Sequence, residues 1–219
     1  RKVMQTRNLI AGEWVGAGSG AELTVINPAT DAEIAKVPKC GTAETRQAID
    51  AAHAAFPLWR EKTAFERGAI LRKIATLMLE RKEELARLMT REQGKPMAES
   101  RGEIAYAASF LDWAAEEGKR LYGDTIPASA PNKRSLVLRQ PVGVCAIITP
   151  WNFPSAMITR KIGPALAAGC TVVVKPAAQT PLSAIAIGEI AMECVLPPGV
   201  LNIVTGSAKE IGDELLSNQ

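Results

Sequence analysis

The chain has 219 residues, of which 47% are hydrophobic and 22% charged, so it is long enough to bury a substantial core. The net charge of +3 comes from 26 basic and 23 acidic residues, and these are interleaved along the chain, which argues against a nucleic-acid partner. No apolar run approaches the ~20 residues of a membrane span, and the N-terminal residues lack the apolar core of a signal peptide. We therefore expect a cytoplasmic protein without a membrane partner.

The cysteines and the histidine give no metal-binding pattern. Cys40, Cys145, Cys170 and Cys194 lie far apart, and the chain has one histidine, His53. We expect reduced thiols and no metal site. The chain begins on Arg rather than Met, which indicates that it is trimmed or incomplete.

Residues 1–120 are expected to form short strands followed by a helical layer. The segments "NLIAGEW" and "LTVIN" precede the turn signal Asn27-Pro28. Thr42 is expected to cap a first helix. A 3.6-residue apolar pattern predicts a second helix, which continues with a break to the stop signal Gly94-Lys95-Pro96. A third helix ends near Gly118. The expected inward positions are Ile49, Ala52, Phe56, Ile70, Leu71, Ile74, Leu77, Met78, Leu85, Leu88, Met89, Ile104, Ala108, Leu111 and Ala115.

Residues 121–141 change in character. The segment "GDTIPASAPNK" is rich in turn formers, and the alternating strand "RSLVLRQ" follows it. This pattern predicts a β arm inserted between the helical layer and the next unit. We expect the arm to pair with another subunit.

Residues 142–219 alternate regularly between strand and helix. The apolar strands "VGVCAIIT", "TVVVK" and "LNIV" are each followed by a helical segment. This order predicts an α/β fold with a Rossmann-like parallel sheet and flanking helices. Ligands of such sheets bind beyond the carboxyl ends of the strands, here the loops "TPWNFP", "KPAAQTP" and "TGSAKEIG".

The first two loops offer polar groups but no glycine-rich phosphate motif. Prolines on both sides of Trp151-Asn152 stiffen the first loop, and the Asn152 amide is suited to stabilise a developing oxyanion. A proline-rich turn with Asn152 as a local cap explains the same residues equally well. Lys175 ends its strand, where it either binds a ribose or phosphate or is an ordinary surface lysine.

Several motifs in the same order resemble the aldehyde dehydrogenase superfamily from end to end: "NPAT", "REQGKP", "PWNFP", "GPALAAGCTVVVKPA", "QTPLSA" and "PPGVLNIVTG". The resemblance implies that Asn152 is the oxyanion donor and that the loop of Thr149, Pro150, Trp151 and Asn152 borders a nicotinamide cofactor. It also implies that Lys175 contacts the adenosine ribose. The further cofactor-binding residues that it implies are Pro176, Ala177, Ala178 and Gly212.

Finer features resemble succinate-semialdehyde dehydrogenases. In that group the position of Arg160 carries an arginine that binds the distal carboxylate of the substrate, and Lys161 matches a lysine near the substrate entrance. Relatives that prefer NAD usually carry a glutamate at the position of Ala178, where it holds the ribose hydroxyls and would repel a 2′-phosphate. Ala178 therefore favours NADP, with NAD as the other cofactor.

The resemblance covers only the first part of such an enzyme. The family's nucleophilic cysteine and general-base glutamate have no match here, so we expect this chain to lack the catalytic domain. That domain is either missing altogether, part of further sequence, or carried by a companion chain. In the whole enzyme the thiolate would attack a small semialdehyde, and Asn152 would stabilise the thiohemiacetal oxyanion. Hydride would pass to the nicotinamide, and the thioester would be hydrolysed. A non-catalytic nucleotide-binding or assembly module is the alternative. For the enzyme we expect a homodimer or homotetramer, with glutarate semialdehyde as another possible substrate.

Overall fold

The computed structural model describes residues 4–218, and strand β8 (Thr171–Lys175) lies between two neighbouring strands of its main sheet. All residues of β8 are buried, as expected for a β-branched strand covered on both faces. Strands β7 (Val144–Ile148) and β9 (Leu201–Ile203) pair with it in parallel. The predicted alternation of strands and helices in residues 142–219 is therefore confirmed.

The sheet continues beyond β9 in a way that the sequence did not indicate. Strands β1 (Asn8–Ile10) and β2 (Glu13–Val15) form a hairpin, and β1 pairs antiparallel with β9. The order is β2-β1-β9-β8-β7, so the sheet is mixed rather than purely parallel. Because β1 is fully buried, the hairpin protects the edge of β9 from solvent. A separate hairpin of β3 (Glu22–Ile26) and β4 (Glu33–Pro38) packs on α6.

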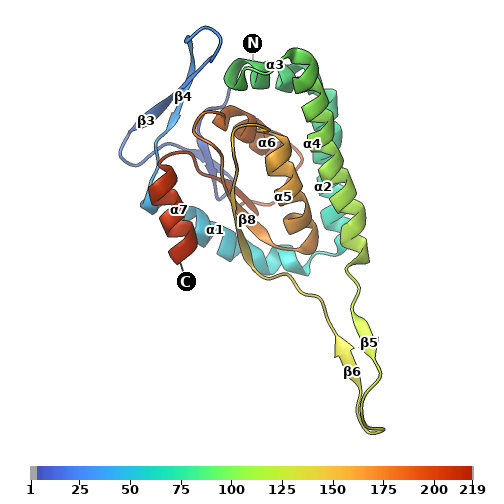
Figure 1. Ribbon diagram of the computed structural model, residues 1–219. Coiled ribbons are helices and arrows are strands. Elements are labelled where there is room, and N and C mark those ends of the chain that lie inside the picture. Colours follow the sequence, from blue (N-terminus) through green and yellow to red (C-terminus); the bar gives the residue numbers. More distant parts are fainter. Residues whose placement is uncertain (1–3, 219) are drawn as a thin grey trace.

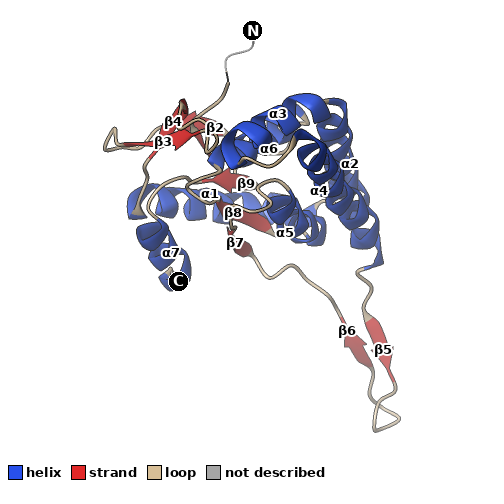
Figure 2. Cartoon of the chain, turned by 45° about the horizontal axis from the view of Figure 1, so that its top comes forward, coloured by secondary structure: helices blue, strands red, loops and turns tan. Residues whose placement is uncertain are grey.

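Helices cover both faces of the sheet, as Figures 1 and 2 show. Helices α1 (Thr42–Glu61) and α7 (Ala208–Ser217) lie on one face. Helices α5 (Ala156–Ala168) and α6 (Pro181–Glu193) lie on the other. Helices α2 (Ala64–Glu80), α3 (Lys82–Gln93) and α4 (Met97–Glu117) form a further layer that packs on α5 and α6. The second and third predicted helices therefore pack behind the helices that follow β7 and β8, whereas the first predicted helix, α1, lies on the opposite face of the sheet.

The helix ends follow the local signals with one correction. The predicted break lies at Arg81, between α2 and α3, and the predicted stop lies at Gly94, whose φ of +91° is left-handed. Thr42, however, is the first residue of α1 rather than its cap. Gly41 occupies the cap position, and its N–H donates to Glu44 Oε2 at 3.1 Å. No helix within residues 4–218 is long and apolar enough to cross a membrane.

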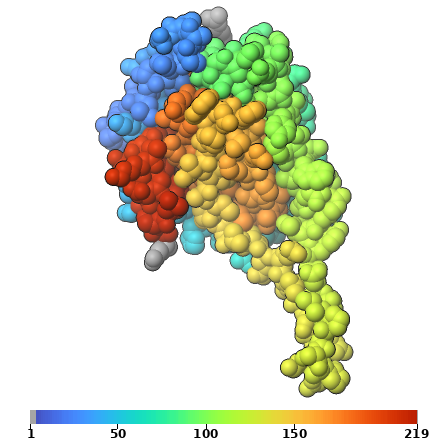
Figure 3. Space-filling model, viewed as in Figure 1, coloured from blue at the N-terminus to red at the C-terminus, as the bar shows by residue number. Residues whose placement is uncertain are grey.

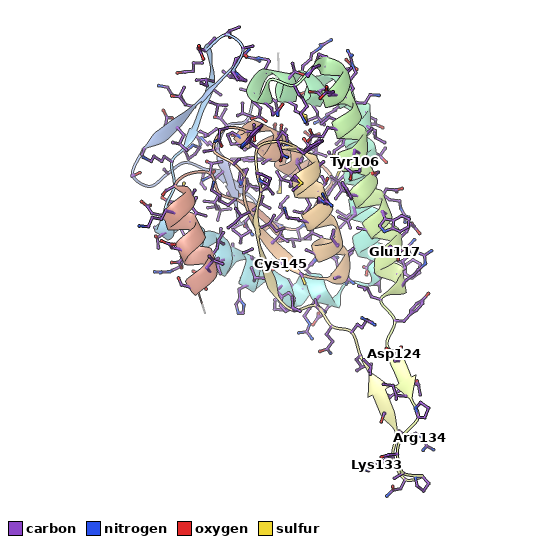
Figure 4. All side chains as sticks on the ribbon, in the orientation of Figure 1. Tyr106, Glu117, Asp124, Lys133, Arg134 and Cys145 are labelled. Atoms are coloured by element: carbon purple, nitrogen blue, oxygen red, sulfur yellow. The ribbon has the colours of Figure 1, made fainter. Side chains whose placement is uncertain are left out.

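The predicted arm is a hairpin that projects away from the body (Figures 1 and 3). A short 3-10 turn, η1 (Gly118–Arg120), leads from α4 into β5 (Asp124–Ile126), which pairs antiparallel with β6 (Ser135–Val137). Figure 4 labels Lys133 and Arg134 towards the tip of the arm. Leu136 is 70% exposed, so the arm carries apolar surface that its own chain does not cover. Its pairing with another subunit stays a prediction.

Candidate functional site

The loops that follow β7, β8 and β9 lie side by side at one edge of the sheet. Ile148 is in register with Lys175, and the Thr149 N–H donates to the Lys175 carbonyl at 3.2 Å. The Val204 N–H donates to the Val174 carbonyl at 2.9 Å and brings the third loop alongside. The structure therefore brings together the three segments that the sequence predicted as the ligand-binding edge.

The first loop presents Asn152 on the surface and buries the residues that follow it. Trp151 is 52% exposed and Asn152 is also exposed, whereas Pro154 and Ser155 are buried. The Asn152 side-chain amide makes no hydrogen bond to another described residue, so Asn152 is not a local cap. Its N–H groups are available to a ligand.

A buried glutamate from α4 anchors the end of this loop. The Glu103 side chain is 1% exposed, and its Oε1 accepts hydrogen bonds from Ser155 N–H at 2.9 Å and Ala156 N–H at 3.1 Å. These are N–H groups at the start of α5, which lack partners inside the helix. Ser155, at the cap position, makes no side-chain cap hydrogen bond. Glu103, from α4, takes over this role and caps α5.

A buried lysine completes this anchor. Lys95 Nζ lies 2.5 Å from Glu103 Oε2 and donates to the main-chain carbonyl of Asn152 at 2.9 Å. The Lys95 ammonium also lies 4.1 Å from the ring centroid of Phe153, a cation–π distance. The Lys95 side chain is 8% exposed. One ion pair therefore holds the loop main chain on both sides of Pro154.

The second loop contains a largely buried lysine and a fully buried hydroxyl, and neither has a hydrogen-bond partner within residues 4–218. Lys175 is 4% exposed, forms no ion pair or hydrogen bond with another described side chain, and has a pKa lowered by burial. The hydroxyl of Thr180 is also buried without a hydrogen-bond partner. Buried polar groups are normally paired, so this loop fits a ligand that offers hydroxyl or phosphate oxygens. The interpretation of Lys175 as a surface lysine is wrong.

A second buried glutamate caps the helix that follows this loop. Glu92, at the end of α3, is 2% exposed and accepts hydrogen bonds from Leu182 N–H and Ser183 N–H, both at 2.8 Å. The Ser183 hydroxyl lies 2.5 Å from the same carboxylate. Burial raises the pKa of Glu92 to about 7, although these hydrogen bonds act in the opposite direction.

The other implied cofactor residues have different surroundings. Pro176 and Ala177 are buried beside Lys175, and Ala178 is exposed at the tip of the second loop. Gly212 lies in the second turn of α7, beyond the free N–H groups at the start of that helix. In the third loop, the Thr205 hydroxyl is already 2.8 Å from Asn8 Oδ1. The roles of these residues stay predictions.

Arg160 and Lys161 lie on α5, two turns after Asn152. The Arg160 guanidinium is exposed and lies 5.4 Å from the ring centroid of Phe110 on α4. Phe110 in turn lies 4.5 Å from Tyr106, centroid to centroid, and Figure 4 labels Tyr106 on α4. Lys161 is half-buried. A cation next to an aromatic surface suits an aliphatic ligand that ends in a carboxylate.

The cysteines do not contribute a nucleophile to this edge. Burial raises the pKa of Cys40 to about 12. A hydrogen bond between the thiols of Cys145 and Cys170 lowers the pKa of Cys170 and raises that of Cys145. Both cysteines lie at the amino ends of their strands. About five residues separate each of them from the loop at the other end, which at ~3.3 Å per residue is roughly 16 Å. No group of three or more potential metal ligands occurs in residues 4–218.

Glu92, Glu103 and Lys95 were missed as site residues by sequence reasoning. Their spacing in the chain resembles that of ordinary helix charges, and Lys95 formed part of a helix stop signal. Glu103 is 52 residues from Ser155, and Glu92 is 90 residues from Leu182. Only the packing of α3 and α4 on α5 and α6 brings them to the loops.

The fold and this edge define a class of protein that comparison confirms. Residues 14–219 match the aldehyde dehydrogenase family, and the chain belongs to it. It is 62% identical over 209 residues to a glutarate-semialdehyde dehydrogenase from Pseudomonas putida, covering 95% of this chain and 44% of the relative. It is 60% identical over 210 residues to the NADP(+) succinate-semialdehyde dehydrogenase of Escherichia coli, covering 96% and 44%.

Solved structures agree with this result. A crystal structure described as an E. coli NADP-dependent enzyme superposes with a TM-score of 0.97 at 59% identity, covering 98% of this chain and 45% of that chain. The chain thus spans less than half the length of these relatives.

Proposed function

We propose that this chain forms the cofactor-binding and oxyanion-stabilising part of an NADP- or NAD-dependent semialdehyde dehydrogenase. Its substrate is succinate semialdehyde or a similar short ω-carboxy aldehyde, such as glutarate semialdehyde. The observation that carries the proposal is the pairing of two features at one sheet edge. Asn152 presents a free amide on an anchored loop, and the largely buried Lys175 offers a cation on the adjoining loop.

In this proposal each residue has a distinct role. Asn152 donates a hydrogen bond to the aldehyde oxygen as negative charge develops on it, and Arg160 binds the distal carboxylate. Lys175 and Thr180 would hold the adenosine ribose, and the unpartnered state of both groups fits that task. The nicotinamide, when bound, supplies the hydride acceptor. The nucleophile is a cysteine other than the four in this chain, whose thiols lie far from the edge or in the interior.

The substrate class follows from Arg160 and from the relatives. The two curated relatives are named for succinate and glutarate semialdehyde, which differ by one methylene and both end in a carboxylate. The Arg160 guanidinium beside Phe110 offers a cation for that end and an apolar surface for the methylenes. NADP is the preferred cofactor in this proposal, because Ala178 places no carboxylate against a 2′-phosphate.

The direct test is turnover by the intact enzyme. Reduced cofactor should form from NADP with succinate or glutarate semialdehyde, and much more slowly with butanal, which lacks the carboxylate. If the intact protein binds NADP but oxidises neither semialdehyde, the non-catalytic nucleotide-binding module is the correct alternative.

The arm supports a further part of the proposal, the pairing with a second copy. Leu136 is 70% exposed and Leu138 is 76% exposed on a hairpin that projects from the body. Exposed apolar surface of this kind is typical of a site that binds another protein chain. Leu138→Asp should shift the intact enzyme to smaller assemblies in light scattering. Leu58→Asp is the control, because Leu58 is 74% exposed but lies on α1 rather than on the arm. Equal masses for wild type and Leu138→Asp would contradict this pairing.

A further inference from the structure

We propose that Lys95 and Glu103 form a positioning pair for Asn152, which fixes the loop main chain so that the side-chain amide stays where the oxyanion develops. The inference rests on the proposed function, because it assigns the pair to the oxyanion donor of that reaction. Neither residue is expected to touch the substrate. They act through the main chain that carries Asn152.

The pair reaches the loop at three main-chain atoms. Lys95 Nζ donates to the Asn152 carbonyl at 2.9 Å, and Glu103 Oε1 accepts from Ser155 N–H at 2.9 Å and Ala156 N–H at 3.1 Å. The contact of 2.5 Å between Lys95 Nζ and Glu103 Oε2 joins these anchors into one unit. Pro154, between the anchored residues, has a fixed φ. The loop therefore retains little freedom apart from the side-chain torsions of Asn152.

The opposite edge of the loop is fixed by the sheet. The Thr149 N–H donates to the Lys175 carbonyl at 3.2 Å and continues the pairing of β7 with β8. The main chain is therefore held by the sheet before Asn152 and by the ion pair at and after it. Without Lys95, its carbonyl would lose the one protein donor that holds it in the described structure.

A requirement for position explains why charges are buried here. Buried ion pairs contribute little net stability compared with apolar residues of similar volume, because each charge must be removed from water. An apolar pair, however, could not donate to a carbonyl and accept from two N–H groups at once. Lys95 and Glu103 satisfy both needs and neutralise each other, with side chains only 8% and 1% exposed.

The first test uses the intact enzyme and kinetic constants. Lys95→Met should lower kcat by about 10- to 100-fold, since a displacement of ~1 Å in an active site can cost about 100-fold. KM for the semialdehyde should change little. Lys95→Arg, which retains the cation, should recover part of the loss. Arg101→Met is the matched control, because Arg101 pairs with Glu83 in an exposed contact on the same helical layer.

A double-mutant cycle separates positioning from general damage. In the Asn152→Ala background, Lys95→Met should cause almost no further loss of kcat, because the group that it positions is gone. A loss of the same size in both backgrounds would overturn the proposal. If Lys95→Met fails to fold, Lys95→Arg and Glu103→Gln provide the same cycle with smaller perturbations.

A second measurement needs no activity. Hydrogen exchange of the Ser155 and Ala156 amides should be faster in Glu103→Gln and Lys95→Met than in wild type and in Arg101→Met. Unchanged exchange would overturn the anchoring itself. Inactivity of the wild-type enzyme towards semialdehydes would instead refute the proposed function, and exchange would still decide whether the pair holds the loop.

Discussion

The loops after β7 and β8 use the same anchor but differ in how charge is balanced. In each, a buried glutamate from the helical layer accepts N–H groups at the start of the next helix, Glu103 for α5 and Glu92 for α6. Glu103 has a lysine partner, whereas Glu92 forms no ion pair with another described residue. In the first loop the charges of Lys95 and Glu103 neutralise each other, so only the neutral amide of Asn152 is free to bind a ligand. In the second loop the charge of Lys175 is not neutralised by a described side chain and is available to a ligand.

This difference matches two tasks. A donor that acts on a transient oxyanion gains from a rigid, neutral frame, because its hydrogen bond must be in place before the charge develops. A cofactor pocket gains from unbalanced charge, because a bound nucleotide supplies the compensating anion.

The largest effect is expected at Asn152. Asn152→Ala in the intact enzyme should lower kcat by ~10²–10³-fold, equivalent to about 2.7–4 kcal/mol, because one oxyanion donor is lost. Cofactor affinity should change little, since Lys175 and Thr180 belong to the other loop. Steady-state kinetics with a separate titration of NADP binding measures both. A near-normal kcat would mean that Asn152 is only a turn residue.

Arg160 should give the next largest effect, and one restricted to charged substrates. A hydrogen bond to a charged group is worth about 1.5–3 kcal/mol, so Arg160→Ala should reduce kcat/KM for succinate semialdehyde by ~10- to 150-fold. The loss for butanal, of equal chain length, should be small. Equal losses for both aldehydes would show that Arg160 acts by packing on Phe110 rather than by binding the carboxylate.

The anchor at Glu92 should make the stability of the protein depend on pH. Because the pKa of Glu92 in the folded protein is raised to about 7, above its unfolded value, the folded state binds more protons between these values. The stabilising contribution of protonated Glu92 is complete below the unfolded pKa and is lost as pH rises towards 7. The free energy of unfolding should therefore fall by about 1.4 kcal/mol per pH unit across that window.

Glu92→Gln is the control for this pH dependence. It cannot ionise, so its free energy of unfolding should lack this component when urea midpoints are compared from pH 5 to 8. Identical pH dependence in wild type and variant would mean that Glu92 titrates normally.

Much of the fold could be predicted because it rests on local patterns. The apolar run at residues 171–175, the left-handed Gly94 and the periodicity of residues 70–89 each act within a few residues of the chain. The antiparallel addition of β1 could not be predicted, because it depends on Leu9 meeting Ile203, far along the chain. The same limit applies to Glu92, Glu103 and Lys95, whose role depends on helix packing.

The site residues were proposed from the family resemblance more than from local patterns, and their roles stay predictions. From the sequence alone Asn152 fitted a local cap and Lys175 fitted a surface lysine as well as a site, and the family resemblance assigned their roles. Thr180 did not stand out, because threonine before "PLSA" resembles an ordinary helix cap. Only the structure shows that its hydroxyl caps nothing, since Glu92 already takes the N–H groups of Leu182 and Ser183.

The smallest effect is expected at Ala178, which tests the charge of the second loop. Lys175 supplies a buried cation, and Ala178, exposed in the same loop, supplies no carboxylate to hold ribose hydroxyls or repel a phosphate. Ala178→Glu should therefore shift selectivity from NADP towards NAD by at least a few-fold, measured as the ratio of kcat/KM for the two cofactors. Ala54→Glu adds one carboxylate at an exposed position of α1 instead and is the control for a change in overall charge. A wild type that strongly favours NAD, with no change in Ala178→Glu, would mean that Ala178 does not face the ribose. The charge of Lys175 in the second loop would then serve to bind some other ligand.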